Sequence, residues 1–414
     1  MNIQKAKNNS IWFFTMVMFS SIFLLVSASW GRHILLLSVL LIALLTIQRW
    51  KYRYMLEEYH FFLLAFACYA FLSAVWAWSS SDAISKGIST TEILVFMFIL
   101  YNHYSRFDSV EQLYDVVKIA SYVVVIYSIY YYGIDFIRLM VAAGTRLENS
   151  YINVNSLGML AATGVVIQVN QIVRKKKKDV FVLGIVPSVF MIAATQSRKA
   201  LVVLVIGVIA SLYIEGTDRK KFLNKLISAV AILTFCAIGV WFVLRLPIFE
   251  GVLERMQGVI AIITGKGNLG RSAEVRSSMV AIGMKQFAKT PIVGIGIGCP
   301  HILAKNELEF DAYLHNNYVE LLTGGGIIGF LIYYGMYVFL FINLWKYRKC
   351  KSETYNLTLI LIIVQLVVDY GAVSCYEKNM FFYLMIFFLD IKNMEKRTKL
   401  AHKGIKNEYN TMRP

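Results

Sequence analysis

Long apolar segments recur along this chain, and most of them contain few or no charged residues. Hydrophobic residues make up 58% of the 414 positions, and the mean hydropathy is +0.59. Continuous apolar runs of this kind are typical of transmembrane helices. Only helices and closed barrels satisfy every backbone polar group in lipid, and these runs lack the alternating pattern of barrel strands. The sequence therefore predicts an all-α integral membrane protein.

We assign twelve apolar spans and test their orientation by charge. With the N-terminus in the cytoplasm, most lysines and arginines fall in the inside segments, as the positive-inside rule expects. We therefore predict about 12 transmembrane helices, two cytoplasmic termini, and one large extracytoplasmic loop between helices 9 and 10. The spans cover approximately residues 11–30, 33–48, 61–78, 89–103, 117–137, 156–173, 180–196, 200–215, 226–245, 318–345, 355–370 and 379–391.

This assignment divides the chain into four parts. Residues 1–245 form transmembrane helices 1–9, and residues 246–317 form an extracytoplasmic catalytic loop with an amphipathic helix. Residues 318–391 form helices 10–12, and residues 392–414 form a basic cytoplasmic tail. The net charge of +17 comes largely from short basic runs between apolar segments, such as Arg174–Lys178, so we expect no nucleic-acid partner.

The long loop contains an amphipathic segment and a glycine-rich turn. Apolar residues between positions 279 and 287 share one helical face, and the helix should end before Pro291. The glycines of Gly294–Gly298 would allow a tight turn and a close approach to a ligand. Arg271 and Arg276 could fork onto phosphate oxygens. The alternative is a basic face that binds lipid head groups.

A His-Asn pair opens the tenth span. An imidazole such as that of His315 is the usual general base near neutral pH, and Asn316 follows it directly. A structural role is the alternative for a single histidine. The five cysteines form no CxxC pair, and no metal motif is present, so we expect no metal and no cofactor. The other histidines have no distinctive setting: His33, His60, His103, His301 and His402.

Two further polar groups flank apolar spans. Arg198 and Lys199 lie in a tight outer turn, where they either clamp phosphate or snorkel to lipid head groups. Arg146 precedes a segment with Asn153 and Asn155, just outside the sixth span. Amide side chains donate and accept hydrogen bonds and therefore suit sugar hydroxyls. Helix capping by Asn155 or Ser156 is the alternative.

The loop motifs together resemble a known family. Arg276, Pro291, Gly294 and Gly296 form the pattern R-x14-P-x2-G-x-G, which is followed by HNNYVELLTGGGIIG from position 315 to 329. This arrangement resembles the shared segment of the O-antigen ligase and O-antigen or capsular polysaccharide polymerase (Wzy-type) superfamily. The segments QSRKA and RLENSYINVNSLG are also similar to motifs of that family.

The resemblance implies a GT-C-like glycosyltransferase fold and an active site on the outer face of the bacterial cytoplasmic (inner) membrane. It implies an undecaprenyl-diphosphate-linked glycan as donor and as acceptor, without nucleotide sugar or metal. Arg276 and Arg198 would then neutralise the diphosphate leaving group, and His315 would take the proton from the acceptor hydroxyl. The substrate-binding candidates are Arg146, Asn153, Asn155, Lys199, Arg271 and Asn316.

Three functions stay open at this point. A repeat-unit polymerase is favoured, with membrane lipids, a flippase and a chain-length regulator as expected partners. The second is an O-antigen ligase that transfers finished glycan to lipid A core or another acceptor. The third is a flippase for lipid-linked glycan, for which we would expect charges inside the helix bundle. Most spans here are free of charge, which favours surface chemistry.

Overall fold

The computed structural model is helical and contains no strand within the residues it describes. This confirms the predicted all-α class for that part of the chain. The described residues are 2–24, 31–47, 54–106, 110–143, 145–147, 153–175, 180–215, 271–350 and 352–411.

The chain forms two compact units, each assembled from separate stretches of sequence. The first unit contains residues 1–45, 114–277 and 363–368, and the second contains residues 46–113, 278–362 and 369–414. Helices α2 (Gly31–Ile47), α5 (Val110–Tyr132), α12 (Arg271–Lys289) and α15 (Tyr355–Asp369) contribute residues to both units.

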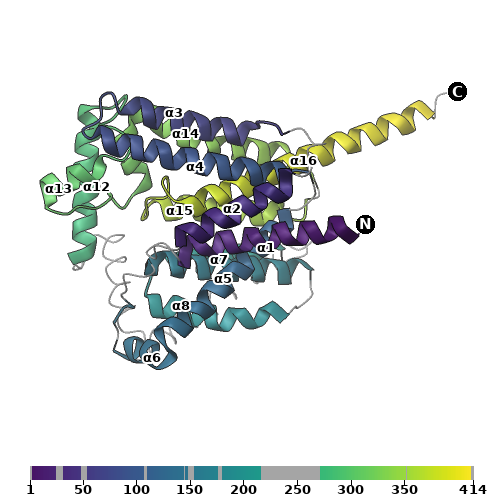
Figure 1. Cartoon of the computed structure of the whole chain (residues 1–414), viewed down its shortest axis with the longest axis horizontal. Coiled ribbons are helices and arrows are strands. Elements are labelled where there is room, and N and C mark those ends of the chain that lie inside the picture. The colour runs from purple at the N-terminus through teal and green to yellow at the C-terminus, as the bar shows by residue number, and fades with distance from the viewer. Residues whose placement is uncertain are drawn as a thin grey trace, which may run out of the picture. The chain divides into compact units, whose positions relative to one another are not determined.

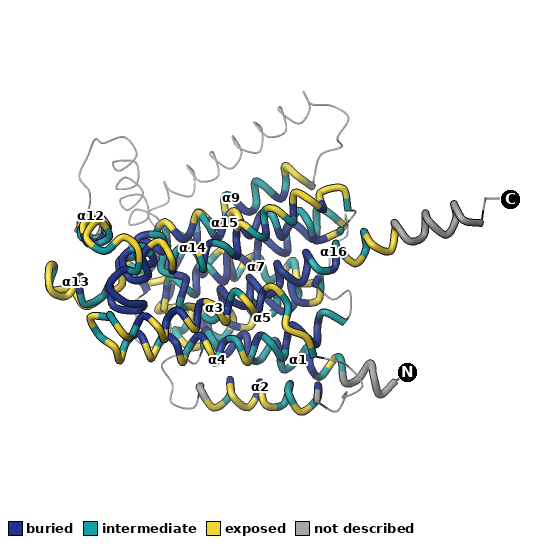
Figure 2. Tube along the Cα trace, turned by 90° about the horizontal axis from the view of Figure 1, so that it is seen from above, coloured by how far each residue is buried: buried dark blue, intermediate teal, exposed yellow. Residues whose placement is uncertain are grey.

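In the first unit, α7 is the most buried helix (Figure 2). It packs against α8 and α9, and Gly207 of α9 allows close contact because a Cβ there would lie 2.4 Å from Val166. A buried ammonium, Lys118, contacts Gln171 at 2.7 Å and Asp115 at 3.0 Å, so this charge is paired inside apolar surroundings. The further helices here are α1 (Asn2–Leu24), α2 (Gly31–Ile47), α6 (Ile134–Ala142), α7 (Val154–Lys175), η1 (Val180–Gly184), α8 (Ile185–Thr195) and α9 (Arg198–Glu215).

In the second unit, α3 packs on α4 and α14, and α16 packs on the same two helices (Figure 1). Large aromatic side chains fill the interior, among them Tyr59, Phe66 and Tyr333. The Tyr59 hydroxyl donates to the Phe381 carbonyl at 2.7 Å, so the buried phenol is satisfied. The bounds are α3 (Glu58–Ser73), α4 (Ser80–Tyr104), α13 (Pro300–Leu308), α14 (Asn317–Lys346) and α16 (Lys378–Thr411).

Eleven of the twelve predicted spans coincide with described helices. The ninth span, 226–245, and residues 246–270 of the predicted loop lie outside the described residues. By length and composition, α4, α5, α7 and α14 could each cross a membrane, and several other helices are apolar but shorter. The total of twelve therefore stays a prediction.

Element boundaries show one agreement and two differences. Helix α12 ends at Lys289, as the position of Pro291 predicted. The predicted span 117–137 is interrupted at Gly133, where the backbone has φ 77° between α5 and α6. The predicted boundary at 391/392 falls inside α16, which continues without a break to Thr411.

Candidate functional site

The site in the second unit is built around a break in α14. Gly326 has φ 59° and ψ −164°, which interrupts the helical hydrogen bonds. The turn after α12 supplies replacement partners: Ile295 N–H donates to the Thr323 carbonyl at 3.0 Å, and Ile327 N–H donates to the Pro291 carbonyl at 2.8 Å. Broken helices inside a membrane protein need such substitutes for their lost bonds. The glycine turn and the broken helix therefore form one structural feature.

The glycines permit this approach of two backbones. A Cβ on Gly294 would lie 2.4 Å from the Gly324 carbonyl oxygen, and one on Gly326 would lie 2.3 Å from the Ile292 carbonyl oxygen. Gly294, Gly296 and Gly298 all have positive φ, so the predicted tight turn is confirmed. The close approach observed at Gly294 is to the backbone of α14. The predicted approach to a ligand stays a prediction.

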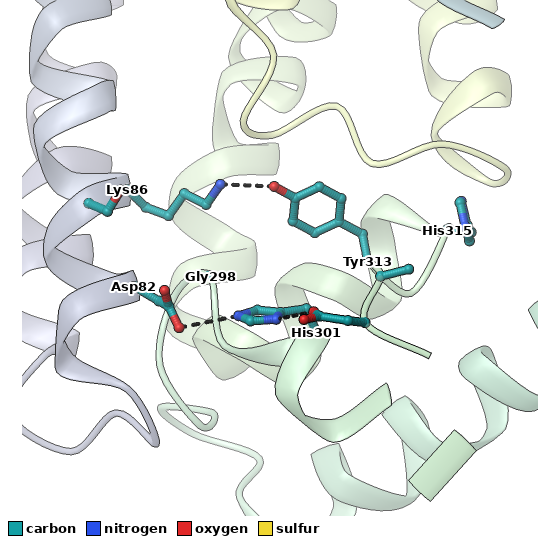
Figure 3. A pocket seen from close by; sticks show the side chains of 9 residues that line it. Asp82, Lys86, Gly298, His301, Tyr313 and His315 are labelled. Carbon is teal, nitrogen blue, oxygen red and sulfur yellow. Dashed lines mark hydrogen bonds and ion pairs between the residues drawn. The ribbon is translucent and has the colours of Figure 1, made fainter. Parts of the chain in front are cut away.

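A pocket of about 470 Å³ lies in this unit, beside the glycine turn (Figure 3). Helix α4 contributes three residues, α13 contributes one, and the segment between α13 and α14 contributes four. A volume of this size falls in the range of about 300–1,000 Å³ that is usual for small-molecule sites. The lining residues are Asp82, Ser85, Lys86, Gly298, His301, Asp311, Ala312, Tyr313 and His315.

His301 lies between two carboxylates on the wall of this pocket. Its Nδ1 is 2.8 Å from an oxygen of Asp311, and its Nε2 is 3.2 Å from an oxygen of Asp82. Burial lowers the pKa of His301, but the hydrogen bonds to Asp311 and Asp82 outweigh this effect, so the pKa is raised overall. The hydrogen bond from His301 in turn lowers the pKa of Asp311. The interpretation of His301 as a histidine without a distinctive setting was therefore wrong.

Lys86 lies on the opposite wall, among tyrosines. Its Nζ donates to the Tyr313 hydroxyl at 3.0 Å and lies 4.4 Å from the ring centroid of Tyr376. The Tyr376 hydroxyl accepts the Gly298 N–H at 3.1 Å, which connects the ring to the glycine turn. The ammonium is thus held by a hydroxyl and by ring faces.

The predicted base, His315, also lines the pocket, in a left-handed backbone conformation with φ 54°. Both neighbouring residues are fixed by helix α14. Leu314 N–H donates to the Glu320 carboxylate at 3.0 Å, and the Asn316 side chain accepts the Val319 N–H at 3.1 Å. Asn316 is therefore the N-cap of α14, a role that sequence reasoning had not assigned to it.

In the first unit, several predicted substrate-binding residues are brought together. Leu147 N–H donates to the Ala194 carbonyl at 3.5 Å, which places neighbouring Arg146 near the turn that precedes α9. Arg198 and Lys199 are the first residues of α9, and both are half-buried. A Cβ on Gly158 of α7 would lie 3.0 Å from Ala200, so the start of α7 also lies against this turn.

The start of α7 is capped by Asn153. Its side-chain oxygen accepts the N–H groups of Asn155 and Ser156 at 3.0 and 3.3 Å. The capping alternative expected Asn155 or Ser156 in this role, so the cap is two or three positions earlier than predicted. Capping uses only the amide oxygen, and the NH₂ group of the exposed Asn153 can still donate.

The remaining predicted arginines lie on α12. Arg271 is its first residue, and Arg276 is half-buried on the second turn. Both belong to the first unit, as do Arg146 and Arg198, whereas His315 belongs to the second. Among the described residues, no group of three or more His, Cys, Asp or Glu has a geometry that could hold a metal ion.

Comparison with known proteins identifies one segment. No curated protein matches the chain. Residues 183–334 match a family model described as O-antigen ligase. The matched range contains Arg198, Arg276, the glycine turn and His315. This segment is similar to the domain of that family, and the match supports the resemblance that the sequence motifs indicated.

Proposed function

We propose that this protein is a polysaccharide repeat-unit polymerase. It would join undecaprenyl-diphosphate-linked oligosaccharides by glycosyl transfer that needs no metal, on the outer face of the bacterial cytoplasmic membrane. One observation carries this proposal. His315 belongs to the segment that matches the family model, and it lines a pocket with polar walls. A histidine at the wall of a cavity can reach an acceptor hydroxyl there.

The proposed reaction is a single displacement. The acceptor hydroxyl oxygen attacks the anomeric carbon of the donor glycan, and the bond from that carbon to the diphosphate oxygen breaks. The hydroxyl proton moves to the imidazole of His315, and the electron pair leaves with the diphosphate. Arg276 and Arg198 would neutralise the charge on the leaving group. One displacement inverts the anomeric centre.

The remaining candidates would bind substrate. The basic and amide residues of the first unit lie near the turn before α9, which supports a common role for them. Phosphates bind cations and sugar hydroxyls bind amides, and both need these groups at short range. Asn316 would act indirectly: as the N-cap of α14, it fixes the backbone next to His315. The proposed substrate-binding residues are Arg146, Asn153, Asn155, Lys199, Arg271 and Asn316.

The charge distribution within the second unit supports an outward-facing pocket. Helices α4 and α14 begin beside the pocket, and α16 leads away from it (Figure 1). The basic run after α14, Lys346 to Lys349, and the lysines of α16 from Lys392 onward lie at the far ends of these helices. By the positive-inside rule, this distribution supports the proposal that those ends face the cytoplasm and that the pocket faces outward.

A ligase is the second candidate, because the matching family model carries that description. A ligase and a polymerase use the same kind of donor and differ in the acceptor. A flippase fits less well, since the matching family model is described as a ligase and not as a transporter. The polymerase proposal implies two functional partners, a flippase that delivers the lipid-linked units and a regulator of chain length.

Resolving the cell's glycans by size tests this function. The gene is deleted and complemented with wild type, His315→Ala, or the control His33→Ala, whose exposed histidine lies on α2 in the other unit. If the protein is a polymerase, the deletion strain and the strain that carries His315→Ala should both show single repeat units on the surface and no long chains. Long chains left on undecaprenyl diphosphate would indicate a ligase instead. Single lipid-linked units trapped on the inner leaflet would indicate a transporter.

A further inference from the structure

We propose that the pocket lined by Asp82, Lys86, His301 and Tyr313 is the acceptor-sugar subsite, which binds the hydroxyl-bearing terminal sugar of the incoming glycan and not its diphosphate. The inference rests on the proposed function, because it identifies which part of the substrate enters this pocket. Neither the family match nor the sequence motifs assign these four residues a role.

The charges of the pocket favour hydroxyl groups over phosphate. Asp82 and Asp311 both line it and balance the cations Lys86 and His301, so the pocket has no surplus of positive charge for a diphosphate. Each carboxylate has about four lone-pair positions, of which His301 uses one on each residue. Ser79 also contacts the carboxylate of Asp82 and Lys305 that of Asp311, and the positions left over can accept hydrogen bonds from sugar hydroxyls. The arginines proposed for the diphosphate, Arg198 and Arg276, are not among the lining residues.

Lys86, one turn after Asp82 on α4, and Tyr313 add a donor and an apolar surface to the same pocket. Lys86 uses one N–H on the Tyr313 hydroxyl, and an ammonium has three N–H groups, so two can donate to sugar oxygens. Tyr313 is 39% exposed, so the part of its ring that Lys86 does not cover can pack against the C–H side of a sugar ring. Donors, acceptors and an aromatic face therefore surround one cavity, as the mixed surface of a sugar requires.

The location of the subsite also fits its proposed role. His315 lines the same pocket, so a sugar bound between α4 and Tyr313 would lie in the same cavity as the proposed base. The bridge formed by His301 connects α4, α13 and the segment leading to His315 (Figure 3). His301 is therefore a positioning residue that keeps these walls at a fixed separation.

Direct binding measurements test the subsite without relying on turnover. The probe is the oligosaccharide repeat unit released by mild acid from the strain's own lipid-linked fraction, free of lipid and phosphate. It is titrated against the full-length protein in lipid nanodiscs. We expect Lys86→Gln and Asp82→Asn to weaken binding about tenfold or more, because each removes a hydrogen bond to a charged group. The control Lys378→Gln removes a lysine of the same unit that does not line the pocket and should bind as wild type does.

The inference is overturned if wild-type protein does not bind the oligosaccharide, or if inorganic diphosphate displaces it competitively. It is also overturned if folded Lys86→Gln and Asp82→Asn both bind like wild type. Tyr313→Ala, at a partly exposed position, replaces either variant that fails to fold. Binding that depends on Lys86 supports the subsite even when the glycan ladder of the deletion strain excludes a polymerase, so the two proposals can fail separately.

Discussion

The side-chain amide of Asn317 donates a hydrogen bond to the carboxylate of Asp369, with 3.3 Å between Nδ2 and Oδ2. The amide oxygen of Asn317 accepts the N–H groups of Ser374 and Cys375 at 2.9 and 3.0 Å. One buried side chain at the start of α14 therefore holds the turn that leads to α16. That turn carries Tyr376, whose ring lies against Lys86, so this network supports a residue that lines the pocket.

Replacing Asn317 with alanine should destabilise the protein strongly. The change removes every bond of this amide and takes the acceptor away from the buried N–H groups of Ser374 and Cys375, each loss costing on the order of 1–3 kcal/mol. We expect a clearly lower unfolding temperature, measured by fluorescence in detergent. Asn343→Ala is the control, because that half-buried amide donates to a carbonyl of its own helix, Phe339. Equal unfolding temperatures for the two variants would contradict the assigned role of Asn317.

The break in α14 predicts that alanine in place of Gly326 lowers stability more than alanine in place of Gly335. Gly326→Ala would force a non-glycine residue to adopt φ 59° and would place its Cβ 2.3 Å from a carbonyl oxygen. Overpacking alone costs about 1–3 kcal/mol. Gly335→Ala, in regular helix of the same element, meets only the Phe62 ring at 3.2 Å. We expect the first variant to lose stability and the second to unfold near the wild-type temperature.

The break in α14 shows which parts of this fold can be predicted from the sequence. The hydropathy pattern located the helices, and Pro291 located the end of α12, because both signals are local. The pairing of the glycine turn with the Thr323–Gly326 segment could not be predicted, since it depends on a contact between backbones about thirty positions apart. The glycines of both segments were visible, but they indicated only close approach and not the partner.

His301 predicts a pH dependence of stability. Its pKa is raised from the ordinary value of 6.5 by Asp311 and Asp82, against the effect of burial, so its bridge is complete below about 6.5 and is lost as pH rises through the raised value. Asp311 also contacts Lys305 at 3.6 Å, and its lowered pKa makes its contribution fall only in strong acid. The unfolding temperature should therefore decrease from mildly acidic to alkaline pH.

The pH effect is measured by comparing wild type with His301→Gln between pH 5 and pH 9. The difference in unfolding temperature should shrink as pH rises, because wild type loses the charge that the variant lacks. His33→Gln, at an exposed position on α2, is the control. A difference that is constant across this range would show that the charge of His301 does not stabilise the fold.

The candidate site was predicted only in part, for a physical reason. His315 and Asn316 were found because they open an apolar span, which is a signal carried by neighbouring residues. Asp82 lies 219 positions before His301, and no local pattern connects them. A histidine acquires a distinctive environment from its spatial neighbours, so the sequence could not distinguish His301 from the other histidines.

Arg276 gives the most direct test of the proposed chemistry. An arginine that neutralises a leaving diphosphate should contribute mainly to the rate, and loss of such electrostatic stabilisation costs roughly 10²–10³-fold. Arg276→Ala should therefore abolish long polymer at normal protein level. Arg276→Lys keeps the charge but loses the bidentate geometry, so its rate should fall between alanine and wild type. Polymer formation from lipid-linked units by purified protein gives both rates.

Lys285→Ala distinguishes this role from binding of lipid head groups. Lys285 is an exposed cation on the same helix, α12, so attraction to anionic lipid would involve both side chains in a similar way. Of these two side chains, only Arg276 is proposed to stabilise the leaving group, so Lys285→Ala should polymerise at the wild-type rate. Equal losses in the two variants, restored together by added anionic lipid, would assign Arg276 to the membrane surface. Long polymer made at the wild-type rate by Arg276→Ala would remove it from the reaction altogether.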